Sequence, residues 1–423
     1  MKIMVVGGGG REHAIIKKIK ENENVEKIYA LPGNGGIAAD AECVDVKATD
    51  LDGICKFAEE NKIDYAVVAP DDPLVLGCVD KLNALGIPCF GPEAKAAIIE
   101  GSKVFSKNLC KKYGIPTAEY EVFTDMDKAL EYLETAPIPT VIKADGLALG
   151  KGVIIAETRE DAKKAVKDMM EDKVFGKSGD QIVIEEFLTG PEVSVLSFTD
   201  GKVVVPMISS MDHKRALDDD KGLNTGGMGT VAPNPYYTKD IAKECMDTIF
   251  VPTINAMNNE GRTFKGCLYF GLMLTPSGPK VIEFNCRFGD PETQVVLPLL
   301  KTDLLTIMQA TTNSTLSEID VEFSEESAAC VVMASEGYPQ SYKTGFEITA
   351  EGDVMKDVYI AGAKLSDGKL LTGGGRVLGV VAKGNCLSCA INNAYDKVNK
   401  VHFENAFYRK DIGKRALQAQ KGK

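Results

Sequence analysis

Short apolar runs alternate with helical stretches over the first 120 residues, and this alternation constrains the fold more than any other feature. The runs KIMVVG, KIYAL, YAVVAP and IPCFGP have the length and composition of strands, and residues 51–61 and 74–85 between them have helical patterns. Strands that alternate with helices form parallel sheets with helices on both faces. We therefore predict a parallel-sheet α/β domain over residues 1–120.

The pattern of predicted elements changes after residue 120. Residues 121–190 combine two strands around a glycine-rich turn with a helix and a further strand, which predicts a small α+β unit. Residues 191–325 carry longer strands, two helices and a polar, glycine-rich loop over 216–235; so long a loop usually serves a function. Residues 326–423 are predicted to form a small β-rich domain. The expected fold class is thus multidomain, α/β and α+β.

Composition excludes several classes of protein. The formal net charge of −12 argues against a nucleic-acid partner, whose phosphates would repel the chain. No apolar run reaches the roughly 18 residues of a membrane helix, and the N-terminus has no signal-peptide pattern. The eleven scattered cysteines indicate reduced thiols, and Cys386 and Cys389, although spaced C-x-x-C, have no second pair to complete a metal site. We expect a cytoplasmic protein without a membrane or nucleic-acid partner.

The first strand runs into a glycine loop, MKIMVVGGGGREHA, that is close to a dinucleotide-binding fingerprint. Gly7 and Gly9 fit that fingerprint, but Glu12 stands at the third glycine position. No acidic residue ends the second strand, where one would bind the ribose of NAD. NAD binding is therefore disfavoured, and two interpretations stay open: a phosphate site at the start of a helix, or a tight turn without a ligand.

The stretch VIEFNCRFGDPETQ (281–294) is the strongest candidate for chemistry. Alternate side chains of a strand share a face, so Glu283, Asn285 and Arg287 are predicted to point one way and Ile282, Phe284 and Cys286 into the core. Two oxygen ligands beside a guanidinium suit a magnesium ion that bridges phosphates. The alternative is an exposed face with a salt bridge.

The stretch VIKADGLALGKGVII (141–155) resembles a Walker A loop but fails its spacing, because only three residues separate Gly146 from Gly150. Gly152 also replaces the Ser or Thr that would bind magnesium. A hairpin with Lys143 and Lys151 is instead a candidate lid over phosphates, and an ordinary surface hairpin is the alternative.

Two further stretches are polar at strand ends. IVIEEFLTGPE (182–192) ends a strand in acids beside apolar residues, an arrangement suited to an adenine between two domains, although acids there are usually only solvated. SSMDHKR (209–215) precedes the long loop with four polar side chains, for which a solvated cluster is the alternative. His213 is not assigned as a general base, because nothing in the sequence places it near a substrate.

Taken in order, these stretches resemble the phosphoribosylamine–glycine ligase family of ATP-grasp enzymes. The resemblance covers nearly the whole chain. Its motifs are GGREHA, PGN, EGSKVFSK, VIKADGLALGKGV, EEFLTGPE, DHKR, NTGGMG, IEFNCRFGDPETQ, GGGRVLGV and RKDIG. It implies an ATP-grasp fold between the N-terminal parallel-sheet domain and the β-rich C-terminal domain. It also implies that ATP phosphorylates glycine and that 5-phosphoribosylamine attacks the glycyl phosphate, giving glycinamide ribonucleotide, ADP and phosphate in purine biosynthesis.

The resemblance assigns roles residue by residue. It implies metal ligands for Mg²⁺ or Mn²⁺ at Glu283 and Asn285, and catalytic residues at Arg287, Asp212 and Lys214. The implied ATP contacts are Lys103, Lys143, Gly146, Gly150, Lys151, Gly152, Glu185, Phe187, Leu188 and Glu192. The implied substrate contacts are Gly9, Gly10, Arg11, Glu12, Asn34, Gly227, Met228, Gly229, Asp290 and Pro291, with Arg376 as a further candidate. The expected partners are small molecules only, and the expected state is a monomer.

Three alternatives remain at this stage. One is a purine-pathway ATP-grasp enzyme that uses another carboxylate, such as formate or bicarbonate. The others are an NAD-dependent oxidoreductase and a nucleotide-binding regulator without activity. The strand 267–274 offers no carboxylate ahead of the metal motif, so the number of metal ligands stays open.

Overall fold

Strand β1 (Lys2–Gly7) lies at the centre of a five-stranded parallel sheet in the computed structural model, which describes residues 1–147 and 152–422. The sheet order is β3-β2-β1-β4-β5, and the other strands span Lys27–Pro32 (β2), Glu42–Cys43 (β3), Tyr65–Val68 (β4) and Cys89–Phe90 (β5). Alternate residues of β1 enter two different cores: Met4 and Val6 face one, and Ile3 and Val5 face the other. The predicted parallel sheet, buried on both faces, is confirmed.

Helices cover both faces of this sheet. α2 (Leu51–Glu60) and α4 (Cys78–Ala84) contribute Ile54 and Leu82 to the first core, whereas α1 (Gly10–Ile19) and α12 (Leu304–Asn313) pack in the second. The remaining helices in this half are α3 (Asp71–Val75), α5 (Ala94–Gly101) and α6 (Lys103–Tyr113). The side chain of Ser102 caps α6, as its sequence position before the apolar run predicts.

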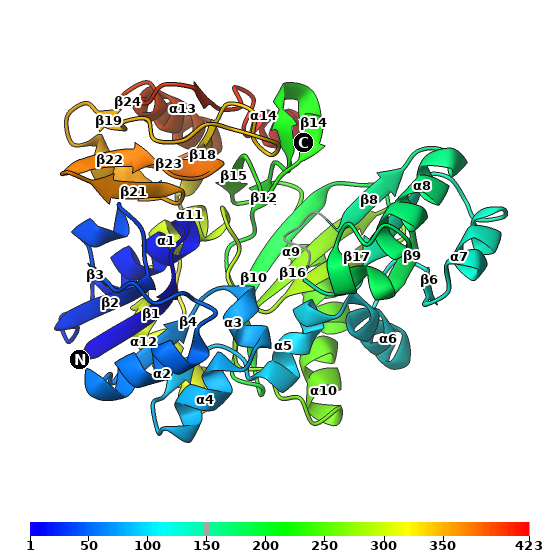
Figure 1. The fold of residues 1–423 in the computed structure, drawn as a ribbon, viewed down its shortest axis with the longest axis horizontal. Coiled ribbons are helices and arrows are strands. Elements are labelled where there is room, and N and C mark those ends of the chain that lie inside the picture. The colour runs from blue at the N-terminus through cyan, green and yellow to red at the C-terminus, as the bar shows by residue number, and fades with distance from the viewer. Residues whose placement is uncertain (148–151, 423) are drawn as a thin grey trace.

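Two antiparallel sheets form the part of the chain for which an ATP-grasp fold is predicted (Figure 1). The smaller sheet has the order β6-β9-β7-β8, with α7 and α8 packed on it, and the larger has the order β11-β10-β16-β17. The smaller set spans Tyr120–Phe123 (β6), Met126–Leu133 (α7), Thr140–Ala144 (β7), Val153–Ala156 (β8), Arg159–Met170 (α8) and Ile182–Glu186 (β9). The larger set spans Glu192–Thr199 (β10), Val204–Pro206 (β11), Gly266–Thr275 (β16) and Gly278–Asn285 (β17), with α9 (Lys239–Cys245) and α10 (Val251–Asn259) beside it. The short helix α11 (Thr293–Val296) packs instead against α1 and the sheet described next.

The third large sheet combines strands from two distant parts of the chain. β12 (Met211–Asp212) and β15 (Gly229–Ala232) pair onward to β18 (Ser327–Ser335), β23 (Arg376–Gly384) and β20 (Val358–Ile360). The region 216–235, predicted as a loop, therefore contains β15 and a hairpin of β13 (Arg215–Leu217) and β14 (Lys221–Asn224). The C-terminal elements are β19 (Thr349–Ala350), β21 (Ala363–Ser366), β22 (Lys369–Thr372), α13 (Leu387–Val398), β24 (Val401–His402), β25 (Ala406–Phe407) and α14 (Lys414–Lys421).

The expectation that all cysteines are reduced is wrong for one pair. Cys386 and Cys389 form a disulfide at the start of α13, because Cys386 caps the helix and Cys389 lies in its first turn. The other nine cysteines are free, and most of them are buried.

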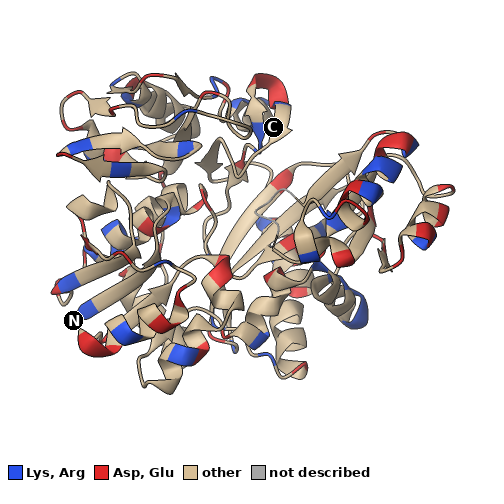
Figure 2. Cartoon of the chain, viewed as in Figure 1, with Lys and Arg blue, Asp and Glu red and all other residues tan. Residues whose placement is uncertain are grey.

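Figure 2 shows acidic and basic residues interspersed along the chain rather than gathered in one part. None of the helices within the described ranges has the length and apolar character needed to cross a membrane.

Candidate active site

The edge strand β17 presents the predicted polar face. Phe284 and Cys286 are buried, while Glu283, Asn285 and Arg287 are partly exposed on the other side of the strand. The predicted alternation is thus confirmed from Glu283 onward, but the prediction for Ile282 is wrong: Val281 is buried in its place and Ile282 is partly exposed, because the pairing of β17 with β16 shifts in register at Ile282. Strand geometry alone places two potential oxygen ligands and a guanidinium side by side.

Three lysines from separate elements surround Glu283. Lys214 Nζ lies 3.3 Å from Glu283 Oε1, and Lys143 and Lys103 add positive charge nearby. Lys214, followed by these two lysines, lowers the pKa of Glu283 to about 2, and Glu283 in turn raises that of Lys214. Glu283 is therefore ionised at neutral pH, and the excess of cations around it suits a polyanionic ligand.

Lys143 links the two ATP-grasp sheets. Its ammonium donates a hydrogen bond to the carbonyl oxygen of Ile282 on β17, at 3.0 Å. It also pairs with Oε2 of Glu185 at 3.0 Å, an oxygen that Lys107 contacts at the same distance. The side chains of Lys107, Lys143 and Glu185 are all about 95% buried, and the two ion pairs fix their positions relative to one another. Lys107 is a member of this cluster that sequence reasoning missed.

The other candidate ATP residues lie on the strands of these two sheets or on the segments next to them. Lys103 Nζ donates to the Gly146 carbonyl at 2.8 Å, and the Gly152 carbonyl accepts from the amide of Ala144. Phe187 and Leu188 follow β9 and are half-buried. Glu192 lines a cavity of about 10 Å³ together with Lys214 and Glu283. Gly150 and Lys151 lie outside the described residues.

Arg287 is held by an acid that the sequence analysis did not single out. Its Nη2 lies 2.8 Å from Glu100 Oε1 and 3.2 Å from Asn285 Oδ1. The other oxygen of Glu100 accepts a hydrogen bond from the backbone amide of Cys286 at 2.7 Å. The motif EGSKVFSK contained Glu100, but nothing in the local pattern predicted a partner 187 residues away.

A second region, a pocket of about 610 Å³, lies between the N-terminal glycine loop and the C-terminal domain. Gly9, Arg11, Glu12 and Asp290 line it from one side. The Glu12 carboxylate accepts from the amide of Gly9 at 2.6 Å, and Asp290 accepts from the amide of Arg11 at 3.2 Å. These bonds fix the start of α1 beside the pocket. Gly10 is buried behind the loop.

Asn34 supports this pocket instead of lining it. Its Nδ2 donates to the carbonyls of Gly8 at 2.9 Å and Ile360 at 2.8 Å, and its Oδ1 accepts from the amides of Gly36 and Ile37. Asn34 thus ties the glycine loop to the C-terminal domain. Lys47 and Tyr338 line the pocket and were not predicted.

Arg376 completes the pocket from the C-terminal domain. Its Nη1 donates to the carbonyls of Gly226 at 2.9 Å and Asp290 at 2.8 Å. The neighbouring Gly227 has a positive φ, and a β-carbon there would lie 2.5 Å from Pro291 and 2.7 Å from Asp212. The turn 226–229 is therefore packed between Asp212 and the 290–291 turn, and its last two residues, Met228 and Gly229, are buried.

Asp212 and Glu292 form an acidic pair in this region. Burial and the nearby Glu292 raise the pKa of Asp212 well above its usual value. Glu292 is buried and accepts a hydrogen bond from the hydroxyl of Tyr269 at 3.1 Å. Asp212 Oδ1 accepts from the amide of His213 at 2.7 Å.

Backbone groups hold the imidazole ring of His213 through both of its nitrogens. Its Nδ1 donates to the carbonyl of Gly229 at 3.1 Å, and its Nε2 accepts from the amide of Gly413 at 3.0 Å. Burial and the cation of Arg409 lower the pKa of His213 to about 4, so the ring is neutral at pH 7. Both ring nitrogens are occupied by backbone groups, consistent with leaving His213 out of the catalytic residues.

Family profiles match almost the entire chain in order. The N domain of phosphoribosylglycinamide synthetase matches residues 1–100, its ATP-grasp (A) domain residues 101–293, and its C domain residues 328–415. A phosphoribosylamine–glycine ligase of Caldanaerobacter subterraneus subsp. tengcongensis is 49% identical over 413 residues, covering 97% of this chain and 99% of that protein. The human trifunctional purine biosynthetic protein adenosine-3 is 44% identical over 98% of this chain, which corresponds to 42% of that protein.

Solved structures agree with these sequence matches. The crystal structure of a phosphoribosylamine–glycine ligase from Thermotoga maritima has a TM-score of 0.85 and 33% identity, and the match covers 97% of this chain and all of that chain. The biotin carboxylase domain of Hydrogenobacter thermophilus 2-oxoglutarate carboxylase has a TM-score of 0.75 at 14% identity, over 96% of this chain and 91% of that one, and shows the fold alone. The predicted ATP-grasp fold is confirmed. The chain belongs to the phosphoribosylamine–glycine ligase family, ATP-grasp ligases of purine biosynthesis.

Proposed function

We propose that this chain joins glycine to 5-phosphoribosylamine in two chemical steps at one site. ATP transfers its γ-phosphoryl group to the glycine carboxylate, and the amine then displaces phosphate from the glycyl phosphate to give glycinamide ribonucleotide. A carboxylate becomes electrophilic once one oxygen is part of a phosphate leaving group. Phosphoryl transfer depends mainly on positioning and charge neutralisation, so no nucleophilic side chain is required.

One structural observation supports this proposal independently of the family match. A single segment, from Glu283 to Asp290, runs from the lysine-surrounded carboxylate on β17 to the 610 Å³ pocket at the glycine loop. The acyl phosphate would form at the first region, and the residues that follow this region in the chain lead to the second region. This continuity supports one active site with a phosphorylating end and an amine-binding end.

For the phosphorylating end, we assign the ATP phosphates to Lys103, Lys143 and the loop 146–153, and the adenosine to Glu185, Phe187, Leu188 and Glu192. Glu283 and Asn285 are oxygen donors beside a cationic cluster, a set that fits Mg²⁺ or Mn²⁺ shared with phosphate oxygens. When bound, the metal ion neutralises charge on the transferring phosphoryl group.

For the amine-binding end, we assign phosphoribosylamine to the pocket of Gly9, Arg11, Asp290 and Arg376. The guanidinium groups of Arg11 and Arg376, which line this pocket, suit the 5′-phosphate. Gly10, Glu12, Asn34, Gly227, Met228, Gly229 and Pro291 are assigned as the frame of this pocket. Lys214 and Arg287 are assigned to the developing charge of the acyl phosphate, and Asp212 to the glycine ammonium.

The remaining assignments concern the molecule as a whole. We propose the domain division 1–120, 121–190, 191–325 and 326–423, a monomer in the cytoplasm, and small molecules as its only partners. The net charge of −12 supports the last point, since a polyanion such as nucleic acid is repelled.

The test is ADP release measured with each component omitted in turn. The full mixture contains ATP, magnesium, glycine, and phosphoribosylamine generated in place from ribose 5-phosphate and ammonia. ADP release that requires glycine and the amine together supports the ligase. Release triggered by formate or bicarbonate instead refutes the assignment to glycine, and ATP binding without release under any mixture refutes the activity.

A further inference from the structure

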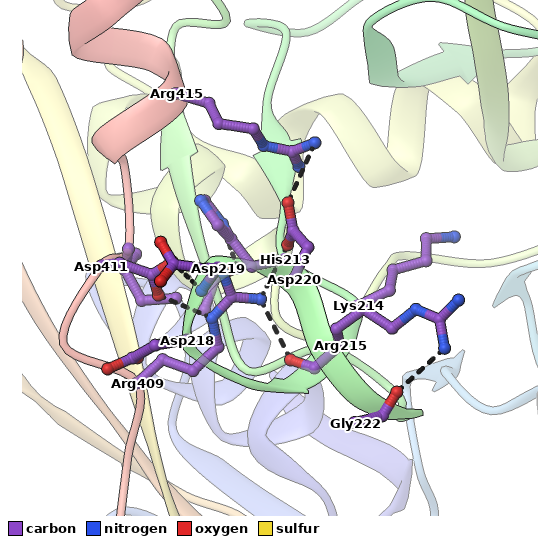
Figure 3. Close-up of polar contacts among 12 residues, drawn as sticks. His213, Lys214, Arg215, Asp218, Asp219, Asp220, Gly222, Arg409, Asp411 and Arg415 are labelled. Carbon is purple, nitrogen blue, oxygen red and sulfur yellow. Dashed lines mark hydrogen bonds and ion pairs between the residues drawn. The ribbon is translucent and has the colours of Figure 1, made fainter.

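A polar arm joins the larger ATP-grasp sheet to the C-terminal end of the chain. We define this arm as residues 213–224, which include the hairpin β13–β14 and the three acids Asp218–Asp220. The opposing C-terminal segment is residues 409–415, which precede and begin α14. Figure 3 shows the side chains of the two segments pointing toward one another, with Arg409 and Asp411 on one side and Asp218, Asp219 and Asp220 on the other.

Arg409 is the centre of this contact. Only 2% of the residue is exposed, which is rare for an arginine in a surface segment. Its Nη1 donates to the backbone carbonyl of Arg215 and to Asp220 Oδ1, both at 3.0 Å. Its Nε and Nη2 each lie 2.8 Å from one oxygen of Asp411, a bidentate pair that fixes the plane of the guanidinium.

Backbone hydrogen bonds extend the contact along the arm. The amide of Asp219 donates to Asp411 Oδ2 at 2.9 Å, and the amide of Lys410 donates to Asp218 Oδ1 at 2.8 Å. The amide of Gly413 donates to His213 Nε2 at 3.0 Å. The C-terminal segment therefore holds both neighbours of Lys214: His213 through its ring and Arg215 through its carbonyl.

Lys214 itself points away from this cluster (Figure 3). Its ammonium reaches Glu283 at 3.3 Å, while its carbonyl accepts from the amide and the hydroxyl of Thr225 at 2.8 Å. A lysine side chain has four rotatable bonds, so its ammonium is well placed only if the backbone that carries it is fixed.

We propose that Arg409 is a positioning residue for the ligase reaction: through Arg215 and the arm, it fixes the backbone of Lys214 and thereby holds the Lys214 ammonium against Glu283. The inference rests on the proposed role of Lys214. It gives the C-terminal domain a second task besides lining the amine pocket, and it places that task at the opposite, phosphorylating end of the site.

The test is a double-mutant cycle on the full-length enzyme. The variants are Arg409→Lys, which keeps the charge but loses the bidentate geometry, and Lys214→Met, each alone and combined. Asp411→Asn is a milder second variant in case Arg409→Lys does not fold. The control is Arg415→Ala, because Arg415 also pairs with Asp220, at 3.2 Å, but its side chain is half exposed and, among the residues that the structure describes, it makes no hydrogen bond to the Arg215 carbonyl. The readouts are kcat, KM for ATP, and circular dichroism.

We expect Arg409→Lys to lower kcat on the order of 10- to 100-fold with KM for ATP within about twofold, since the phosphate lysines are untouched. In the Lys214→Met background, the same substitution should change kcat by less than about twofold, because its effect passes through Lys214. Arg415→Ala should retain kcat.

Three results overturn the proposal, and they are distinguishable. A loss from Arg409→Lys that is equally large in the Lys214→Met background means that Arg409 does not act through Lys214. A wild-type kcat for folded Arg409→Lys and Asp411→Asn, while Lys214→Met is slow, means that the reaction does not depend on Arg409. A wild-type kcat for Lys214→Met refutes the proposed role of Lys214 itself, and with it any positioning through Lys214.

Discussion

Glu100 and Arg287 form an ion pair of 2.8 Å that joins the end of α5 to the polar face after β17. Glu100 also binds the amide of Cys286, so one carboxylate sets both the backbone and the guanidinium orientation. We expect Glu100→Gln to lower kcat about 10- to 100-fold by releasing Arg287 and to destabilise the fold by up to about 3 kcal/mol. Steady-state ADP release and urea unfolding measure the two effects. Glu93→Gln is the control, because Glu93 lies at the other end of α5 and its half-exposed side chain pairs only with Lys95 among the described residues. A folded Glu100→Gln enzyme with unchanged kcat contradicts the expectation.

Glu283 should be needed for turnover but not for folding. Glu283→Ala removes a proposed metal ligand from a partly exposed position, so we expect kcat to fall about 100-fold or more while the melting temperature stays near that of wild type. Stabilisation by magnesium and ATP in a thermal shift assay should be reduced in the same variant. ADP formation at the normal rate by the folded variant would remove Glu283 from the metal site.

Lys143→Met should impair the use of ATP. The ammonium of Lys143 touches β17 and Glu185, and its loss removes positive charge next to the proposed phosphate site. We expect KM for ATP to rise about tenfold, the equivalent of about 1.4 kcal/mol. Lys163→Met is the matched control, because Lys163 lies in α8 of the same domain and pairs on the surface with Glu134. Equal KM values for the two variants would show that Lys143 does not contact ATP.

Arg376→Gln should affect the amine substrate selectively. Its guanidinium lines the pocket that we assign to phosphoribosylamine, and a phosphate there would gain a charge-assisted contact. We expect KM for phosphoribosylamine to rise about tenfold or more, with KM for ATP within about twofold. Lys369→Gln, on β22 of the same domain, serves as the control. A parallel rise in the KM of every substrate would indicate general loosening and not loss of a phosphate contact.

His213 should make the protein less stable in acid. Its pKa of about 4 in the folded state lies below the ordinary value of 6.5, so between these pH values the unfolded chain binds a proton that the folded chain does not. Stability is therefore lost as the pH falls from 6.5 toward 4, by about 3 kcal/mol at most. Urea unfolding across this range, compared with His213→Gln, isolates the effect, and His402→Gln tests an exposed histidine. A difference between wild type and His213→Gln that does not vary with pH contradicts the assignment.

The sequence predicted those features that depend on local periodicity. The parallel sheet follows from short apolar runs between helices, and the Glu283–Asn285–Arg287 face follows from strand alternation. The C-x-x-C pair shows the limit of such reasoning, because helix capping by Cys386 brings its sulfur to Cys389, and spacing alone did not reveal it.

Features that depend on distant partners could not be predicted. Glu100 meets Arg287, and Arg376 meets the 226–227 turn, across 187 and 150 residues of chain. The sequence predicts a loop in place of the hairpin β13–β14, because the strands of this hairpin are polar. Ion pairs with the C-terminal segment hold the hairpin in place, whereas most strands are held by their apolar face. Local patterns contain no information about such partners.

The amine pocket is lined by residues from both ends of the chain, from Gly9 near the N-terminus to Arg376 in the C-terminal domain. The strands of the parallel sheet behind Gly9 all come from the first hundred residues, whereas the pocket also needs Asp290 and Arg376. During synthesis, the residues of the glycine loop are therefore made well before the residues that line the opposite side of the pocket. On our assignment, the binding site for the amine is complete only when the last domain docks.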